Sequence, residues 1–195
     1  MMRLVNLVNE KDEIIGQTDL LDAHRGEGKK HQAISWFLFR KNEAGVLELL
    51  LQQRSDRKIV GATAWANTLC ANVAPGETHQ MCLQRRSKEE LGLIWQEDWQ
   101  TREVAVLDYQ VACEAGFSEN ELDHFFVTVL NSQQAAAVRV LPNPEEVMGF
   151  QWMSWELVQS KKFADTIVIA PWFNLFLDKP QVVAAINQEL VYGHS

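Results

Sequence analysis

Residues 65–93 read WANTLCANVAPGETHQMCLQRRSKEELGL, and this stretch decides how the rest of the chain is interpreted. It predicts a buried strand with Cys70 at its end, a tight Pro-Gly turn, and a helix that opens at Glu77. Arg86 and Glu90 are four residues apart, so they share one face of that helix. A cation and a carboxylate beside a thiol indicate a site for a metal-bound diphosphate, although an exposed helix with ion pairs would show the same charges.

The composition indicates a single domain that spans residues 1–195. A chain of 195 residues with 47% hydrophobic side chains can bury one sizeable core and is short for two domains. No apolar run reaches the length of a membrane span, and the N-terminal sequence MMRLVNLVNEKDE lacks the apolar centre of a signal peptide. Cys70, Cys82 and Cys113 cannot all pair and have no CxxC spacing, which is typical of a reducing compartment. We therefore expect a cytoplasmic protein.

The net charge of -8 argues against a nucleic acid or an anionic membrane as the partner, because either would need basic patches. A small anionic substrate would need a local group of basic side chains. Arg54, Arg57 and Lys58 form such a group directly before the strand that contains Cys70. Arg offers a planar fork and Lys a mobile point charge, and both suit phosphate oxygens. A solvated loop is the alternative interpretation of these residues.

The remaining segments predict further strands, one early helix and a helical C-terminal part. Thr18 is the expected N-cap of the early helix, which runs from Asp19 to His24. Later helices are expected from Trp155 to Lys161 and in the segments IAPWFNLFL and PQVVAAINQELV. Strands are expected at Leu4–Val8, Ile14–Gln17, from His31 onward, at Leu47–Arg54, Val104–Ala112, Glu121–Leu130 and near residues 149–154.

Two pairs of side chains are candidate metal ligands. His24 ends the early helix and His31 starts a core strand, so the six-residue loop between them can bring both imidazoles to one rim. Glu119 and Glu121 are two residues apart, so in a strand they point to the same side and can bind one metal ion, and Asp123 continues this acidic row. Single histidines in such places often only cap or hydrogen-bond, and paired carboxylates are common at solvated strand ends.

The order of these motifs resembles the type I isopentenyl-diphosphate isomerase family. In chain order the motifs are His24, His31, LLLQQRSDRK, WANTLC, GET followed by RRSKEELG, ENELDHFF, EVMGFQWMSW and APW. The resemblance covers nearly the whole chain. It implies an α/β (α+β) protein with the Nudix-like α/β/α sandwich, a mixed central sheet and C-terminal helices. It also implies an enzyme of isoprenoid biosynthesis that interconverts isopentenyl diphosphate and dimethylallyl diphosphate.

The resemblance also implies a role for each candidate residue. The catalytic residues would be Cys70, Glu121 and, beside it, Tyr109. The ligands of a Mn²⁺ or Zn²⁺ ion would be His24, His31, Glu119 and Glu121, and Glu90 would serve a Mg²⁺ ion on the diphosphate. The substrate-binding residues would be Arg54, Lys58 and Arg86 for the phosphates and Trp172 for the hydrocarbon chain.

These residue types fit the chemistry that the resemblance implies. Moving a double bond by one carbon adds a proton at one position and removes a proton from another, through a tertiary carbocation. A thiol on one strand and a metal-bound carboxylate on another can act as these two acid/base groups from opposite sides of the substrate. A tryptophan face can stabilise the cation by up to about 2 kcal/mol where water is excluded.

The sequence departs from the family pattern at three places. The family has a histidine metal ligand where this chain has Asn72, and an amide oxygen is a weaker ligand than imidazole for a zinc-like ion. A lysine that the family uses for the diphosphate is Leu20 here, and a Pro-Gly turn is replaced by Gly61-Ala62-Thr63. A weakened isomerase, or a relative with another diphosphate substrate, therefore stays open.

Two other functions also stay open. A Nudix-type hydrolase would use the box G-x5-E-x7-R-E-U-x-E-E-x-G-U, whose glutamates bind magnesium. In this chain Ala71 stands at the first glycine of the box and Arg86 at the first helix glutamate, while Glu77, Arg85 and Glu90 fit. The second alternative is a catalytically silent diphosphate-binding protein that keeps the fold. The sequence gives no indication of the oligomeric state.

Overall fold

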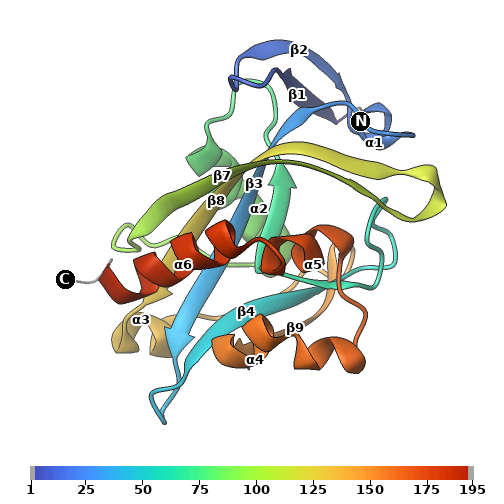
Figure 1. Cartoon of the computed structure of the whole chain (residues 1–195). Helices are drawn as coiled ribbons and strands as arrows, with labels where there is room; N and C mark the ends of the chain where they lie inside the picture. The colour runs from blue at the N-terminus through green and yellow to red at the C-terminus, as the bar shows by residue number, and fades with distance from the viewer. Residues whose placement is uncertain (1–2, 193–195) are drawn as a thin grey trace.

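The structure of the protein, a computed structural model, describes residues 3–192, so Met1, Met2 and residues 193–195 lie outside the described residues. Within residues 3–192 the strands form one mixed sheet of nine strands (Figure 1). Its central strand β3 (His31–Lys41) pairs in parallel with β8 (Ser118–Leu130) on one side and antiparallel with β6 (Leu69–Asn72) on the other. The other strands are β1 (Leu4–Val8), β2 (Ile14–Asp19), β4 (Leu47–Arg54), β5 (Trp65–Ala66), β7 (Thr101–Ala112) and β9 (Val147–Ser154).

Helices cover both faces of this sheet, which confirms the predicted α/β/α sandwich. One face packs against α4 (Trp155–Ser160), α5 (Pro171–Leu177) and α6 (Pro180–Tyr192), and its core includes Phe37, Phe125, Phe173 and Ile186. The other face packs against α2 (His79–Leu91) and α3 (Ser132–Ala137), and its core includes Ile34, Trp36 and Leu83. The remaining helices are α1 (Leu20–His24) and two short 3-10 turns at Glu114–Gly116 and Lys162–Asp165.

The register of β3 and β8 decides which side chains share a face. Side chains alternate along a strand, so His31 points to one face and Ile34, three residues later, to the other. In the parallel register His31 lies opposite Glu121, and Ile34 lies opposite His124. Glu121 therefore shares the face of His31, while His124 lies on the α2 face with Ile34.

Two predicted helix starts are wrong by one or two residues, because another side chain caps each helix. Thr18 belongs to β2, and Asp19 caps α1 by accepting the Leu21 N–H at 2.9 Å. Glu77 does not open α2, because the Thr78 side chain is the N-cap of that helix. The Glu77 carboxylate stays in the turn.

The single strand expected before the Pro-Gly turn is two short strands with different neighbours. β5 pairs with β4, and β6 pairs with β3. Asn67 and Thr68 separate them and replace the missing ladder contacts with side-chain hydrogen bonds: Asn67 Nδ2 donates to Leu69 O at 2.9 Å, and Thr68 Oγ1 donates to Leu50 O at 2.7 Å. This break lets Cys70 reach the face of the sheet on which the active-site candidates lie.

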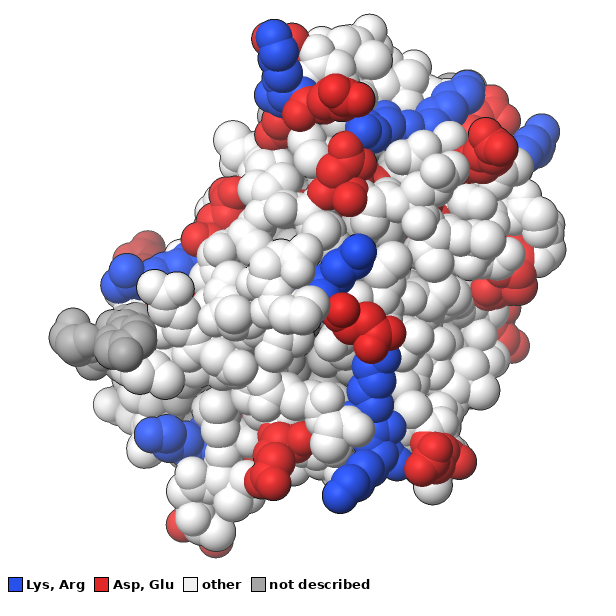
Figure 2. Space-filling model, viewed as in Figure 1, with Lys and Arg blue, Asp and Glu red and all other residues white. Residues whose placement is uncertain are grey.

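The predicted strands and later helices are confirmed, but α3 was not expected from the sequence. Its signal is a capping box, in which Asn131 and Gln134 satisfy each other's backbone N–H groups. None of the helices within residues 3–192 is long and apolar enough to cross a membrane. Basic and acidic side chains are interspersed on the face shown in Figure 2.

Candidate active site

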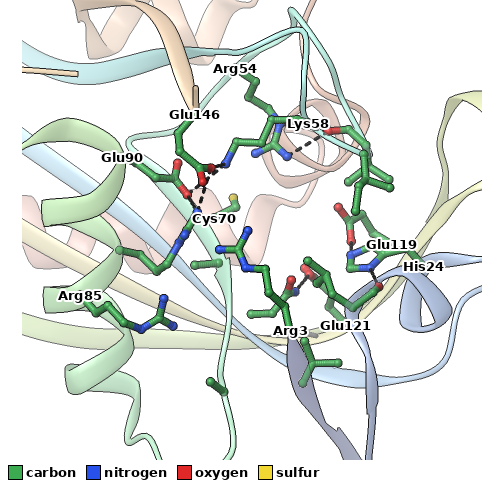
Figure 3. Close-up of a pocket in the computed structure, with 18 of the residues that line it drawn as sticks. Arg3, His24, Arg54, Lys58, Cys70, Arg85, Glu90, Glu119, Glu121 and Glu146 are labelled. Atoms are coloured by element: carbon green, nitrogen blue, oxygen red, sulfur yellow. Dashed lines mark hydrogen bonds and ion pairs between the residues drawn. The ribbon is translucent and has the colours of Figure 1, made fainter. Parts of the chain in front are cut away.

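A cavity of about 600 Å³ lies beside the central strand β3, where β6 and β8 flank it. Its lining brings together Cys70 from β6 and Glu121 from β8 (Figure 3). Trp172 from α5 also lines it. The predicted substrate and metal residues that also line it are His24, Arg54, Lys58, Asn72, Arg86, Glu90 and Glu119. Segments that are far apart in the sequence thus meet at one site, as the motif order predicted.

The four candidate metal ligands form one buried cluster. His24, His31, Glu119 and Glu121 each offer an atom, and these atoms all lie within 4.8 Å of one another. His24 Nε2 is 2.9 Å from a Glu119 oxygen, and His31 Nε2 is 3.4 Å from a Glu121 oxygen. Both Nδ1 atoms are 2.7 Å from backbone carbonyls, of Leu20 and Lys29 respectively, to which they donate. This leaves both Nε2 atoms free to ligate, as in the histidine sites of metalloproteins.

The electrostatics of this cluster fit a divalent cation. Burial and the neighbouring Glu121 raise the pKa of Glu119. Burial lowers the pKa of His24, but the bond to Glu119 outweighs it and raises the pKa to about 9. His31 Nε2 and Glu119 Oε2 are buried without a hydrogen-bond partner among the described residues. Two imidazoles and two carboxylates are a suitable donor set for a transition-metal ion, whose charge would balance the carboxylate pair.

Glu121 is also held by two neighbours that are not metal ligands in the cluster. The Tyr109 hydroxyl donates a hydrogen bond to Glu121 Oε2, and Asn72 Nδ2 donates to Oε1 at 3.0 Å. Burial raises the pKa of Glu121, but the nearby His31 ring and the hydrogen bond from Tyr109 outweigh it and leave the pKa below its usual range. Asn72, which stands where the family has a histidine, therefore faces the cluster, with its amide as a donor to a ligand.

The Cys70 thiol is surrounded by polar groups. Trp172 Nε1 donates to Cys70 Sγ at 3.1 Å, and Cys70 Sγ lies 3.1 Å from Asn67 Oδ1 and 3.2 Å from Ser35 Oγ. Ser35 donates in turn to Asp123 Oδ2 at 2.7 Å. Burial, followed by the charge of Asp123, raises the pKa of Cys70 well above its usual value. These contacts fix the direction in which the thiol points.

The cations at the rim already have acidic partners. Lys58 Nζ binds Glu146 and lies 3.2 Å from Glu90 Oε1. Arg86 Nη2 binds Glu90 and lies 3.1 Å from Glu146 Oε2. Burial raises the pKa of Glu90, but Lys58 and Arg86 outweigh it and hold that pKa below its usual range. Glu90 therefore belongs to an ion-pair network at the rim and lies outside the His/Glu cluster.

Arg54 and Trp172 form the wall beside this network. The Arg54 guanidinium lies 4.8 Å from the centre of a Trp172 ring and donates to Val60 O at 3.1 and 2.9 Å. Gly61 makes room for the indole, because a Cβ at Gly61 would lie 2.5 Å from Trp172 Cη2. Gly61 also has a φ of +59°, which favours glycine. Arg57 lies at the exposed end of the cavity and pairs with Glu145.

Four polar residues of the site were not expected from the sequence. Ser35 and Asn67 hold the thiol, Glu146 pairs with the rim cations, and Arg3 lines the cavity beside Leu20, whose N–H donates to Arg3 O at 2.7 Å. Ser35 had a signal, since it is four residues after His31 in the same strand and so shares its face. Glu146 begins the motif EVMGFQWMSW but was given no role there, and Arg3 lies outside the motifs.

The chain is similar in sequence to proteins of known family. Residues 29–173 match the NUDIX domain family. The chain is 35% identical to isopentenyl-diphosphate Delta-isomerase of Nocardia farcinica, over 86% of this chain and 89% of that protein. It is 32% identical to the Aliivibrio fischeri protein of that name, over 89% and 92%. For the Photobacterium profundum protein of that name the identity is 30%, over 95% of both chains.

Solved structures share the fold at lower identity. A protein from Deinococcus radiodurans superposes with a TM-score of 0.66 at 20% identity, over 90% of this chain and 97% of that one. A Nudix hydrolase from M. smegmatis gives a TM-score of 0.58 at 19% identity, over 92% and 94%. At these identities the likeness concerns the fold, and the sequence relatives decide the family. The chain belongs to the NUDIX domain family and, within it, to the isopentenyl-diphosphate Delta-isomerase family.

Proposed function

We propose that this protein interconverts isopentenyl diphosphate and dimethylallyl diphosphate. The observation that carries the proposal is the shared cavity of Cys70 and Glu121, which come from strands on opposite sides of β3. Each group can exchange a proton with a carbon of the bound alkene. One group adds a proton to the terminal alkene carbon, C4, while the other removes a proton from C2, the carbon next to the CH₂ that carries the diphosphate. The roles exchange when the reaction runs in reverse.

The neighbours of these two groups support the assignment. Trp172 and Ser35 orient the Cys70 thiol, and Tyr109 orients the Glu121 carboxylate. The Trp172 indole, which is almost fully buried, gives the carbocation an apolar, electron-rich wall in place of water. Holding both groups and the alkene in one geometry accelerates the reaction, because the entropy cost of bringing them together is met on binding.

We propose that Mn²⁺ or Zn²⁺ binds His24, His31, Glu119 and Glu121, and that Glu90 serves a Mg²⁺ ion carried by the diphosphate. When bound, the first ion supplies positive charge that fixes the carboxylates and tunes the acidity of Glu121. Burial, donor types and the unpaired atoms of the cluster support this assignment. Asn72 would serve that ion only weakly.

We propose that the diphosphate binds at the basic rim. Arg54, Lys58 and Arg86 line the cavity there, and their donors suit phosphate oxygens. Arg3 lies beside Leu20, the position of the family lysine, and supplies a cation to the same part of the cavity. The three cysteines, which are unpaired in the part of the chain that the structure describes, support a reducing, cytoplasmic setting.

The hydrolase alternative has less support. In a Nudix hydrolase the first helix glutamate of the box would bind magnesium, whereas Arg86 stands there and pairs with Glu90. The helix therefore offers one carboxylate fewer for magnesium than the box of a hydrolase requires.

The test is direct. Pure protein is incubated with isopentenyl diphosphate, Mg²⁺ and Mn²⁺, and dimethylallyl diphosphate is sought by NMR. We expect conversion by the wild type and a loss of at least about 100-fold in kcat for Cys70→Ala. The matched control is Cys82→Ala, whose thiol lies in the core on the α2 face and should leave turnover near normal. Phosphate release from nucleoside diphosphate derivatives without any isomer would instead establish the hydrolase.

A further inference from the structure

A second cluster of metal-ligand side chains lies on the opposite face of the sheet. Asp12, His79 and His124 each offer one atom, and these atoms all lie within 4.8 Å of one another. Asp12 is in the turn between β1 and β2, His79 is the first residue of α2, and His124 is in β8. Three segments that are far apart in the chain therefore meet here.

This cluster is separate from the active site. His124 follows Asp123 in β8, so the two side chains point to opposite faces of the sheet. The Asp123 carboxylate contacts Ser35 on the active-site face, whereas the His124 ring lies 3.9 Å from the His79 ring, between centroids, on the α2 face. The sheet itself lies between the two groups of ligands.

His124 has an unsatisfied nitrogen that points into the cluster. The residue is 6% exposed, and its Nε2 has no hydrogen-bond partner within residues 3–192. Asp12 Oδ2 lies 3.1 Å from this nitrogen without forming a hydrogen bond. Two ligands on a tetrahedral zinc ion with bonds of about 2.0 Å are separated by about 3.3 Å, so the spacing suits a shared cation. Buried polar atoms normally have a hydrogen-bond partner that replaces the water they lose on folding, and this nitrogen has none in the described part of the chain.

Neighbouring side chains orient two of the ligands. His124 Nδ1 lies 2.9 Å from Glu103 Oε1 and donates to it, which leaves the lone pair on Nε2 for a metal. Gln32 Nε2 donates to Asp12 Oδ1 at 2.9 Å, which leaves Oδ2 directed at His124. A carboxylate behind a ligating histidine is the usual support of a zinc site, and Gln32 is itself buried.

We propose that Asp12, His79 and His124 bind a Zn²⁺ ion, with water as the fourth ligand. Two imidazoles and one carboxylate are a donor set that zinc accepts, and Glu103 adds a second negative charge close by. The ion would join the β1–β2 turn, the start of α2 and β8 on the face away from the cavity. This inference does not rest on the proposed isomerase activity.

The experiment counts zinc on the full chain, because the His/Glu cluster is proposed to bind a metal ion as well. Metal-free protein is titrated with Zn²⁺ in competition with a chromophoric chelator. We expect two ions per chain for the wild type, one for His31→Gln, one for His124→Gln and none for the double variant, with unchanged circular dichroism. Equal zinc binding by His31→Gln and by the double variant would overturn the proposal.

A milder pair of variants guards against misfolding of the histidine changes. In the His31→Gln background, Asp12→Asn should weaken the remaining Zn²⁺ binding at least tenfold, and Glu103→Gln should weaken it on the order of 10-fold through His124. The matched control is Glu10→Gln, an exposed acid of the same turn that is not in the cluster. Equal affinities in Asp12→Asn and Glu10→Gln would also refute the site. Turnover of Asp12→Asn in the wild-type background should stay unchanged, which separates this result from failure of the isomerase proposal.

Discussion

Glu121 is the residue at which the proposed metal site and the proposed proton transfer meet. Its Oε2 accepts a hydrogen bond from the Tyr109 hydroxyl, and its Oε1 lies close to both His31 and Asn72. A carboxylate held on both oxygens cannot rotate freely, so a small change in one neighbour changes its orientation and its acidity together. Substitutions around Glu121 therefore probe metal binding and chemistry at once.

Asn72→His should tighten metal binding. Asn72 Nδ2 reaches Glu121 Oε1 at 3.0 Å, so an imidazole at position 72 would enter the same space and offer a better ligand. We expect Mn²⁺ affinity to rise on the order of tenfold, about 1.4 kcal/mol, by titration calorimetry. Activity should rise at limiting metal and much less at saturation. Asn72→Gln, which keeps the amide, is the control, and equal affinities for the histidine and glutamine variants would contradict the prediction.

Arg3→Gln should weaken substrate binding. Arg3 lines the cavity beside Leu20, where the family has a lysine for the diphosphate. Loss of one charge-assisted contact at an exposed rim should raise KM roughly threefold to tenfold, about 1 kcal/mol, with kcat little changed. Lys11→Gln, in the β1–β2 turn and not among the cavity residues, serves as the control. If both variants share the wild-type KM, Arg3 does not contact the diphosphate.

At the scale of elements, the sequence predicted the parts that follow strand periodicity and family motifs. The family resemblance placed His31 and Glu121 in one site, and in the structure they lie opposite each other in β3 and β8. The division into β5 and β6 could not be predicted, because it depends on the Thr68 hydroxyl finding Leu50 O in a distant strand. The predicted first residues of two helices were wrong because more than one neighbouring residue could begin each helix.

Glu146 shows why the site was only partly predictable. It begins the motif EVMGFQWMSW, but its place at the rim depends on a contact between distant segments, in which Asn143 N donates to Glu90 O at 2.9 Å. The same holds for the contacts of Lys58 with Glu90 and Glu146, whereas the pair of Arg86 and Glu90 follows from their spacing of four residues. Ion pairs between distant segments leave no spacing in the sequence.

The turn around Gly61 connects backbone geometry to the cavity wall. Gly61→Ala would combine a positive φ with a Cβ placed 2.5 Å from Trp172 Cη2. We expect a loss of about 2–4 kcal/mol in the free energy of unfolding by urea denaturation, and a lower kcat because the indole would move from Cys70. Gly45→Ala is the control, since Gly45 has a φ of +78° with nothing within 4 Å of its Cβ position. The control should lose only about 1–2 kcal/mol and keep its kcat. Identical kinetics in both variants would exclude a role for the Gly61 contact.

For the whole molecule, metal binding should contribute to stability. The buried Glu119 and Glu121 carboxylates repel each other without an ion, and the four ligands come together only in the folded state, which is the state that a Mn²⁺ ion would bind. At about 100 times its Kd the ion should add about 2.7 kcal/mol, which raises Tm by about 5–10 °C in a chain of this size. Differential scanning calorimetry checks this. His31→Gln should lose most of the shift and His124→Gln should keep it, whereas a full shift in His31→Gln would place the ion elsewhere.

The ion pairs at the rim determine how a ligand can enter. Lys58 and Arg86 are already paired with Glu90 and Glu146, so in the proposed binding mode a phosphate has to take the place of a carboxylate. Binding is then a counter-ion exchange, in which the total charge contact changes little and the gain comes from a better geometric match. A ligand with a single phosphate can replace fewer of these contacts than a diphosphate, and a neutral isoprenoid can replace none. In the proposed binding mode, Glu90 and Glu146 compete with the ligand, so ligands with more anionic oxygens are favoured.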